Sequence, residues 1–184
     1  MTRVYYDTEF IEDGRTVELI SIGMVREDGA EYYAVARDAP WERVREDAWL
    51  MAHVVPSLPR AEGGGSGREP GEWPGIDLGD PCVKPKSLIA EEVAGFVLGV
   101  ERPELWAWYG PYDYVVTARL FGSFQDRPPG WPMFAFDLKQ EAVRLGDPRL
   151  PEQETGLHNA LADARHNKVV GEFLLRRAEE DGRV

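Results

Sequence analysis

The chain has 184 residues, 43% of them hydrophobic, and a formal net charge of −12 at pH 7. This size and composition predict one globular domain over residues 1–184, and they argue against a disordered chain or a second full-sized domain. The acidic balance argues against a protein that binds long nucleic-acid duplexes tightly by neutralising phosphates. It does not argue against a protein that holds a few nucleotides through bound cations, because the ions then supply the local positive charge.

We expect neither a membrane-spanning helix nor a secretory leader. No run of about 18 or more apolar residues occurs, and the N-terminal residues enter a strand-like run directly. The single cysteine, Cys82, cannot form an internal disulfide, which suits a reducing compartment. The sequence therefore predicts a cytoplasmic protein without a membrane partner.

The first third of the chain predicts three strands and a helix. Strand-like runs occupy residues 3–7, 19–26 and 30–36, and residues 27–29 indicate a tight hairpin between the second run and the third. After Pro40, one continuous helix is predicted, with an apolar stripe made of Val44, Ala48, Met51 and Ala52.

Residues 57–86 predict a long mobile loop that interrupts the domain as an insertion. The stretch holds 7 of the chain's 19 glycines and 5 of its 14 prolines, and no core can be built from its glycine-rich centre. A loop of this length is either functional or disordered, and the sequence leaves both readings open.

The second half of the chain predicts alternating helices and strands. Ser87 is the expected N-cap of a helix over residues 88–98. A strand at 105–109, a helix to 120, a strand at 133–136, a helix at 137–145 and a last helix from near Asn159 follow. This order predicts an α/β fold in which three antiparallel strands are extended by parallel strands and flanked by helices. Such an order matches a ribonuclease H-like mixed sheet.

Asp7 and Glu9 are the first candidates for a site. They are two residues apart on a predicted strand, so both side chains point to one face, with Cα atoms about 6.6 Å apart. Two acids on one face of a first, central strand are poorly explained by solvent exposure alone. The alternative is a strand end that emerges into solvent.

Two further acids and a histidine lie later in the chain. Asp113 follows a strand-to-helix break, where α/β sheets place their ligands, although the helix dipole also favours an aspartate in a first turn. His158 and Asp163 would be about 140° apart on one continuous helix. If Asn159 is the N-cap, His158 belongs to the preceding loop and can turn towards Asp163. The alternative is a surface histidine before an ordinary amphipathic helix.

Together these residues resemble the DEDD exonuclease superfamily in its histidine-bearing (DEDDh, DnaQ-like) branch. Asp-x-Glu lies near the N-terminus, a lone aspartate lies in the middle, and His-x-x-x-x-Asp opens the last helix. The tyrosine-bearing branch would place a tyrosine where this chain has Asn159. The resemblance implies a metal-dependent 3′–5′ exonuclease whose catalytic residues are Asp7, Glu9, Asp113, Asp163 and His158.

Four carboxylates brought together need a counter-charge. At an effective dielectric of about 20 and about 4 Å, each ionised pair costs roughly 4 kcal/mol, so the cluster takes up protons or binds cations. Carboxylate oxygens without cysteine ligands favour Mg²⁺ or Mn²⁺. The resemblance implies two ions: Asp7 bridging both, Glu9 and Asp163 completing one shell, and Asp113 reaching the second mainly through water. His158 would be the general base, because an imidazole exchanges protons near neutral pH.

Within that branch, the chain is similar to the actinobacterial group of polyadenylate-specific 3′-exoribonucleases (AS). The similarity lies in residues 6–14, 18–23, 31–35, 104–108 and 158–164. Most histidine-branch enzymes carry a second glutamate near position 21, whereas this chain, like the AS group, has Ser21 there and Glu18 earlier. The glycine-rich loop departs from the group. The resemblance implies single-stranded RNA 3′ ends or 3′ overhangs as substrate, nucleoside 5′-monophosphates as products, a preference for polyadenylate, and a homodimer.

The candidate substrate contacts are Phe10, Glu18 and Thr8. Phe10 could stack under the terminal base or belong to the core. Glu18 could accept a hydrogen bond from an exocyclic amine and so favour adenine, or it could be a solvated strand end. His53 and His166 have no distinguishing spacing and are interpreted as structural or surface residues.

Two other functions stay open at this point. A DNA proofreading or repair exonuclease would carry the same metal site, so the catalytic residues do not separate it from a ribonuclease. A catalytically silent RNA-binding module would be expected to lack at least one acid, and all five site residues are present.

Overall fold

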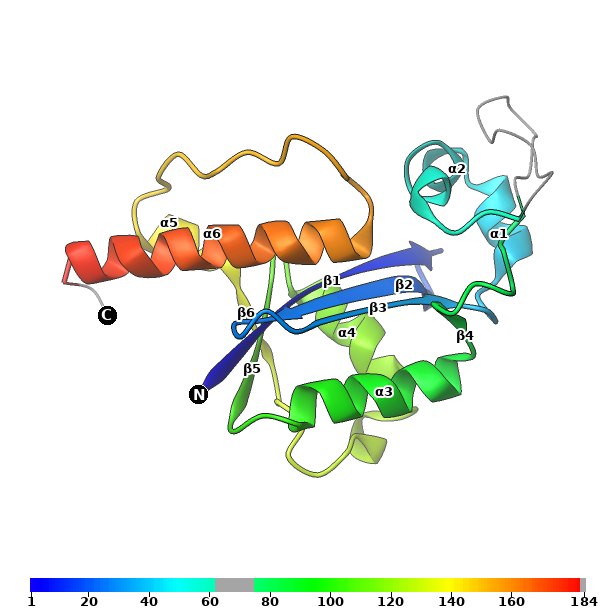
Figure 1. Ribbon diagram of the computed structural model, residues 1–184, viewed down its shortest axis with the longest axis horizontal. Helices are drawn as coiled ribbons and strands as arrows, with labels where there is room; N and C mark the ends of the chain where they lie inside the picture. The colour runs from blue at the N-terminus through cyan, green and yellow to red at the C-terminus, as the bar shows by residue number, and fades with distance from the viewer. Residues whose placement is uncertain (62–74, 183–184) are drawn as a thin grey trace.

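The computed structural model describes residues 1–61 and 75–182. Its sheet has six strands in the order β4-β3-β2-β1-β5-β6 (Figure 1). β1, β2 and β3 pair antiparallel, whereas β5 and β6 extend the sheet in parallel beside β1, and β4 does so beside β3. The predicted mixed, ribonuclease H-like sheet is therefore confirmed. The strands are Thr2–Glu12 (β1), Val17–Arg26 (β2), Glu31–Ala36 (β3), Val83–Lys84 (β4), Pro103–Ala107 (β5) and Ala135–Asp137 (β6).

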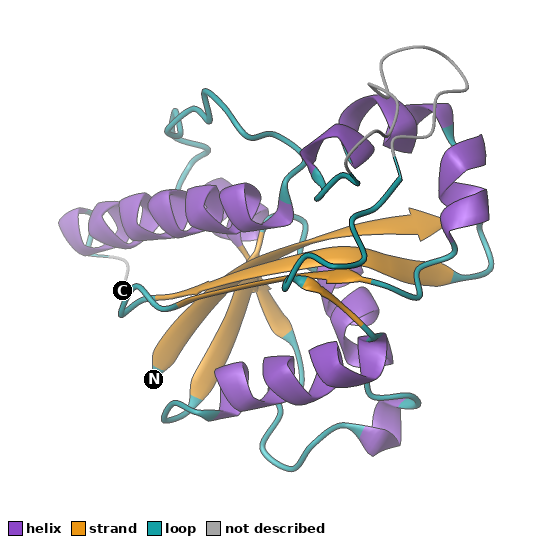
Figure 2. Cartoon of the chain, turned by 45° about the vertical axis from the view of Figure 1, so that its right-hand side comes forward, coloured by secondary structure: helices purple, strands orange, loops and turns teal. Residues whose placement is uncertain are grey.

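Helices cover both faces of the sheet (Figures 1 and 2). The long helix α6 crosses β1 and β2 on one face, and α3 and α4 lie on the other. No helix in the part of the chain that is described is long and apolar enough to cross a membrane. The helices are Trp41–Glu46 (α1), Ala48–His53 (α2), Val55–Ser57 (η1), Lys86–Leu98 (α3), Pro111–Arg119 (α4), Phe124–Asp126 (η2), Leu138–Arg144 (α5) and Ala160–Glu180 (α6).

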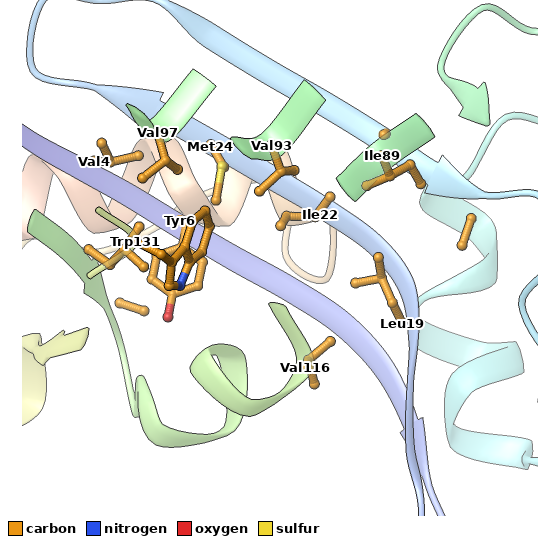
Figure 3. Close-up of a cluster of buried hydrophobic side chains, with 14 of the residues drawn as sticks. Val4, Tyr6, Leu19, Ile22, Met24, Ile89, Val93, Val97, Val116 and Trp131 are labelled. Atoms are coloured by element: carbon orange, nitrogen blue, oxygen red, sulfur yellow. The ribbon is translucent and has the colours of Figure 1, made fainter. Parts of the chain in front are cut away.

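Alternating side chains of β1 divide the core between the two faces. Tyr6 is fully buried and packs in the cluster that contains the apolar side of α3 (Figure 3). Its neighbour Tyr5 packs on the opposite face with Leu174 of α6. Because strand side chains alternate, Asp7 and Glu9 lie on the same face as Tyr5, under α6.

Gly23 sets the distance between α6 and the sheet. A Cβ atom at this position would lie 2.3 Å from backbone atoms of Ala160 and Leu161. Gly23 is also the residue of β2 that pairs with Asp7 of β1. The first turn of α6 therefore rests on the sheet directly beside Asp7, and this contact brings Asp163 to the same place.

Replacing Gly23 by alanine should destabilise the protein, because the added methyl group meets backbone that cannot rotate away. We expect a loss of about 1–3 kcal/mol in the free energy of unfolding, or roughly 3–9 °C in Tm for a chain of this length. The matched control is Gly95→Ala in α3, where an added Cβ meets no atom within 4 Å and alanine is the better helix former. Thermal denaturation followed by circular dichroism measures both variants, and an unchanged Tm for Gly23→Ala would contradict the close contact.

The single helix predicted after Pro40 is wrong, because two short helices occupy this stretch. Asp47 lies between α1 and α2 in an extended conformation, and its carboxylate accepts the N–H groups of Trp49 and Leu50, each at 2.9 Å. Aspartate is more favourable as an N-cap than in a helix interior. The apolar stripe is therefore interrupted, and α2 starts in a new direction.

The predicted N-cap at Ser87 is also wrong, because α3 begins at Lys86, two residues before the predicted start. The N–H of Lys86 donates to Asp38 Oδ1 at 2.8 Å, and the carbonyl of Pro85 accepts from Ile89. A carboxylate from a distant segment thus supplies the cap, which local sequence does not reveal.

Part of the predicted loop insertion has regular structure. Val83–Lys84 forms β4, which pairs with β3 and which the sequence did not indicate, since a strand of two residues has no detectable period. Arg60 and Ile76 form an isolated antiparallel bridge. Residues 62–74 of the predicted loop lie outside the described residues.

Candidate active site

Three carboxylates meet at the C-terminal half of β1. Oxygen atoms of Asp7, Glu9 and Asp163 all lie within 4.8 Å of one another. The first two come from one face of β1, as predicted, and the third comes from the first turn of α6. Directly after Glu9 the β1–β2 register shifts, so that Glu9 pairs with Ser21 while Phe10 pairs with Leu19. This bulge ends the regular alternation immediately beyond the carboxylates.

Asp113 reaches the site from α4. Its Oδ1 accepts both the N–H of Thr8, at 2.8 Å, and the hydroxyl of Thr8, at 2.7 Å. The Thr8 amide is available because β1 and β5 pair only as far as Tyr5 and Trp106. Where the two parallel strands separate, the first turn of α4 supplies a carboxylate that takes the place of a strand partner.

Asp113 is buried and lies in a second tier beside the three clustered carboxylates. It is not part of the group whose oxygens lie within 4.8 Å of one another, but its charge raises the pKa of both Asp7 and Glu9. Thr8 is predicted as a substrate contact, but in this structure its hydroxyl donates a hydrogen bond to Asp113.

Burial raises the pKa of every carboxyl in the group, and mutual repulsion adds to the shift at Asp7 and Glu9. Burial raises the pKa of Asp7 well above its ordinary value, and Asp113, Glu9 and Asp163 raise it further. Burial, then Asp163 and Asp113, raise the pKa of Glu9 to about 8. Burial raises the pKa of Asp113 to about 7, although the hydrogen bonds from Thr8 act in the opposite direction. The cluster therefore holds its full negative charge at neutral pH only when a cation compensates it.

His158 lies in the loop before α6, which is the arrangement that follows when Asn159 is the N-cap. Asn159 is the N-cap, because its side-chain oxygen accepts the N–H of Ala162 at 3.1 Å. His158 has a left-handed backbone, with φ of 61°, which turns it away from the helix. Burial raises the pKa of Asp163, and the nearby Gln153 and His158 act in the opposite direction. The imidazole is therefore within electrostatic reach of the carboxylate group.

Several residues that the sequence did not single out border the site. The amide of Gln153 donates to Asp163 Oδ1 at 2.6 Å. The rings of Trp49 and His53, both on α2, lie 4.9 Å and 5.4 Å from the His158 ring, measured between centroids. His53 is thus exposed, as interpreted, but it is a neighbour of the site. Helix contacts at i and i+4 relate Trp49 to His53, but no sequence signal relates either to His158.

The two remaining candidates lie on the α4 side of the sheet. Phe10 is half-buried and stacks on Tyr112 of α4, with ring centroids 6.2 Å apart and planes inclined by 9°. Glu18 Oε2 forms an ion pair with Lys86 at 2.8 Å. It lines a pocket of about 110 Å³ between β2, α3 and α4, whose walls include Val116 and Arg119.

The raised pKa values set the pH dependence of stability without metal. The pKa of Glu9 is about 8 and that of Asp113 about 7 in the folded protein, against ordinary values of 4.5 and 3.8. Between about pH 4 and pH 8 the folded state keeps protons that the unfolded chain releases, so stability falls as pH rises through this window. In chelator, Tm should drop by roughly 5–10 °C between pH 5 and pH 8, and millimolar Mg²⁺ should recover most of it at pH 8. A Tm that rises with pH in chelator would contradict the raised pKa values of these buried carboxyls.

The comparisons with known proteins identify close relatives. No family model matches the chain. Two Mycobacterium tuberculosis proteins, the 3′-5′ exoribonuclease MT2234.1 of strain CDC 1551 and the 3′-5′ exoribonuclease Rv2179c of strain H37Rv, are each 40% identical over 165 residues. The match covers 89% of this chain and 87% of each relative. Among solved structures, Schizosaccharomyces pombe Pop2p in its Mg²⁺- and Mn²⁺-bound form covers 96% of this chain and 82% of its own, with 13% identity and a TM-score of 0.40.

Identity of 40% across nearly the whole of both chains establishes common descent and a common fold. The acids and the histidine of the DEDDh pattern are all present, and the structure brings three of the acids together around β1. The chain therefore belongs to the 3′–5′ exoribonuclease family of these two mycobacterial proteins.

Proposed function

We propose that this protein removes nucleotides one at a time from the 3′ end of single-stranded RNA, or of a 3′ overhang, in a reaction that requires two divalent cations. The observation that carries the proposal is the cluster of Asp7, Glu9 and Asp163, whose oxygens lie within 4.8 Å of one another. The buried Asp113 beside them completes the set of four acids. A fold that needs only stability does not gain from four carboxyls whose pKa values are all raised.

The donor set fits Mg²⁺ or Mn²⁺. All four groups offer hard carboxylate oxygens, and bound cations would compensate the burial and the mutual repulsion that raise the pKa values of Asp7 and Glu9. We propose that Asp7 would serve as a ligand for both ions, that Glu9 and Asp163 would hold one, and that Asp113 would support the second. Bound there, the ions would stabilise charge on the phosphate and lower the pKa of the attacking water.

The residues of the chain would then divide the work of hydrolysis. A water attacks the phosphorus of the last phosphodiester, and the imidazole of His158 takes a proton from that water as general base. The bond from phosphorus to the 3′ oxygen of the preceding nucleotide breaks, and that oxygen leaves with the bonding electron pair and takes up a proton from solvent water. The products are a nucleoside 5′-monophosphate and an RNA shortened by one nucleotide with a free 3′-hydroxyl. Gln153 would hold Asp163 in one orientation through its 2.6 Å hydrogen bond.

We propose that adenine is preferred through contacts on the α4 side. Phe10 lies with Tyr112 at the end of β1 and offers a ring on which a base can stack. The ammonium group of Lys86 donates to Oε2 of Glu18. We therefore propose that Oε1 of Glu18 accepts a hydrogen bond from the exocyclic amine of adenine. Thr8 would act on the substrate only through Asp113, whose position it fixes.

Digestion of 5′-labelled homopolymeric RNAs and a matched DNA oligomer with Mg²⁺, Mn²⁺ or chelator tests these statements together. We expect a ladder shortened from the 3′ end, fastest for oligoadenylate and absent in chelator. Equal rates on RNA and DNA would instead indicate a DNA exonuclease of the same superfamily, because recognition of the 2′-hydroxyl is what separates the two substrates. Binding without any shortening would indicate a silent RNA-binding module.

We also propose a cytoplasmic homodimer. Cys82 is the one cysteine of the sequence and is a free thiol, and burial raises its pKa to about 12, which makes it a poor partner for disulfide exchange. Light scattering across working concentrations should give twice the chain mass. A monomeric mass at every concentration would overturn the dimer.

A further inference from the structure

Two aromatic residues of the segment from Trp49 to Ser57 contact the ring of His158. The indole of Trp49 and the imidazole of His158 meet nearly edge to face, with centroids 4.9 Å apart and planes inclined by 80°. His53 completes a three-ring group, with centroids 5.4 Å from His158 and 5.0 Å from Trp49. Edge-to-face contacts of this kind are attractive and directional, so they restrict rotation of the imidazole.

The same segment also holds the backbone at His158. The hydroxyl of Ser57 lies 2.7 Å from the carbonyl oxygen of His158 and 2.8 Å from that of Val54, so its one proton is shared between these two acceptors. In return, the side-chain amide of Asn159 donates to the carbonyl of Ser57 at 3.3 Å. The left-handed backbone of His158, with φ of 61°, costs free energy in a residue that has a side chain and so needs such support. Helix α2 and η1 therefore contact the loop at the proposed general base, and α2 lies beyond the N-terminal end of α6 (Figure 1).

The aromatic contacts of Trp49 and His53 suit the role that His158 has in the proposed function. An imidazole held by a hydrogen bond uses one of its nitrogens, whereas one held by an aromatic neighbour keeps both nitrogens for proton exchange. A general base must also be aimed at the proton it removes, and small errors of position lower the rate strongly.

We propose that Trp49 is a positioning residue that aims the imidazole of His158 at the attacking water. This inference rests on the proposed role of His158 as general base. Trp49 itself touches neither the phosphate nor the water in this scheme. Trp49 is 52% exposed, so the rival role is a stacking platform for a base of the RNA.

The two roles predict different kinetic changes in the full-length protein with Mg²⁺ and 5′-labelled oligoadenylate. If Trp49 positions His158, Trp49→Ala should lower kcat by roughly 10- to 100-fold and leave KM within about twofold. Trp49→Phe keeps a ring at this place and should restore most of kcat. Phe124→Ala removes an aromatic residue of similar exposure, 61%, from η2 and is the matched control. It should keep wild-type kcat and KM.

A double variant gives the decisive comparison. Trp49→Ala combined with His158→Ala should be no slower than His158→Ala alone, because a positioning residue has nothing left to position. Full additivity of the two losses would overturn the inference. So would a raised KM with unchanged kcat in Trp49→Ala, which would assign the indole to RNA stacking. If Trp49→Ala does not fold, Trp49→Leu replaces it with the same expected kinetics, since leucine keeps bulk but has no ring.

The outcome for His158→Ala separates this inference from the proposed function. If His158→Ala hydrolysed RNA at the wild-type rate, His158 would not be the general base, and the inference about Trp49 would be overturned as well. A large loss in His158→Ala beside wild-type kcat in Trp49→Ala would leave the proposed function standing and overturn the positioning role alone.

Discussion

Replacing Asp7 by asparagine should lower kcat by about 10³-fold or more, equivalent to about 4 kcal/mol of transition-state stabilisation. Asp7 is the carboxylate that we assign to both ions, and asparagine keeps its shape while removing its charge. The same substitution should raise Tm in chelator at pH 8, because it relieves repulsion from Asp113, Glu9 and Asp163. Steady-state hydrolysis and thermal denaturation measure the two effects on one preparation.

Opposite changes in activity and stability are the signature of a residue kept for chemistry. Asp28→Asn is the matched control, because the exposed Asp28 pairs with Arg26 at 2.9 Å and its hydrogen bonds, first that from the Ala30 N–H, lower its pKa. This variant should keep kcat and gain no stability. If Asp7→Asn loses activity and stability together, Asp7 has a structural role and the metal assignment is unsupported.

The second large effect is expected from His158→Ala. Loss of a general base lowers kcat by about 10²–10⁴-fold, whereas the affinity for Mn²⁺ should stay within about twofold, because the carboxylates that we assign to the ions remain. Rates at saturating RNA and Mg²⁺ isolate the chemical step. Tm should change little, since His158 lies in a loop and is only partly buried.

His166 provides the comparison for that experiment. It lies on α6, three residues beyond Asp163 and close enough to lower the pKa of that carboxyl. In the proposed mechanism it has no role, so His166→Ala should keep kcat within about twofold. A larger loss for His166→Ala than for His158→Ala would show that the base had been assigned to the wrong histidine.

The parts of the site that the sequence predicted are those set by local geometry. The two-residue spacing of Asp7 and Glu9 placed both side chains on one face of β1, and the structure has them there. The sequence offered Asn159 as one possible cap of the last helix, and its side chain caps α6. Because Asn159 is the cap, His158 lies outside the helix. The five-residue spacing between His158 and Asp163, which is unsuitable on one continuous helix, is then compatible with both residues acting at one site.

The parts that the sequence did not reveal depend on contacts between distant segments. Nothing local indicates that Gly23 must admit the backbone of Ala160, yet that contact brings Asp163 over β1. Gln153 has no spacing that relates it to the carboxylates, and Trp49 approaches His158 from another helix. Such residues are found only after the chain has folded, because their role is defined by what lies across from them.

The errors in the predicted helices have two origins, one a local capping interaction and the other a contact with a distant segment. Asp47 interrupts a stretch whose apolar stripe is continuous, since a capping interaction outweighs a weak helical period. At Lys86, a carboxylate from Asp38 supplies a cap that the neighbouring Ser87 was expected to provide. Element types were therefore predicted well and boundaries less well.

Counting bound Mn²⁺ tests the central claim most directly, because the claim is that these carboxylates exist to hold cations. Titration of the protein with Mn²⁺, with free ion measured by electron paramagnetic resonance, gives the number of ions per chain. We expect two ions for the wild-type protein and at most one, weakly bound, for Asp7→Asn. Equal numbers and equal affinities in the two proteins would contradict the account.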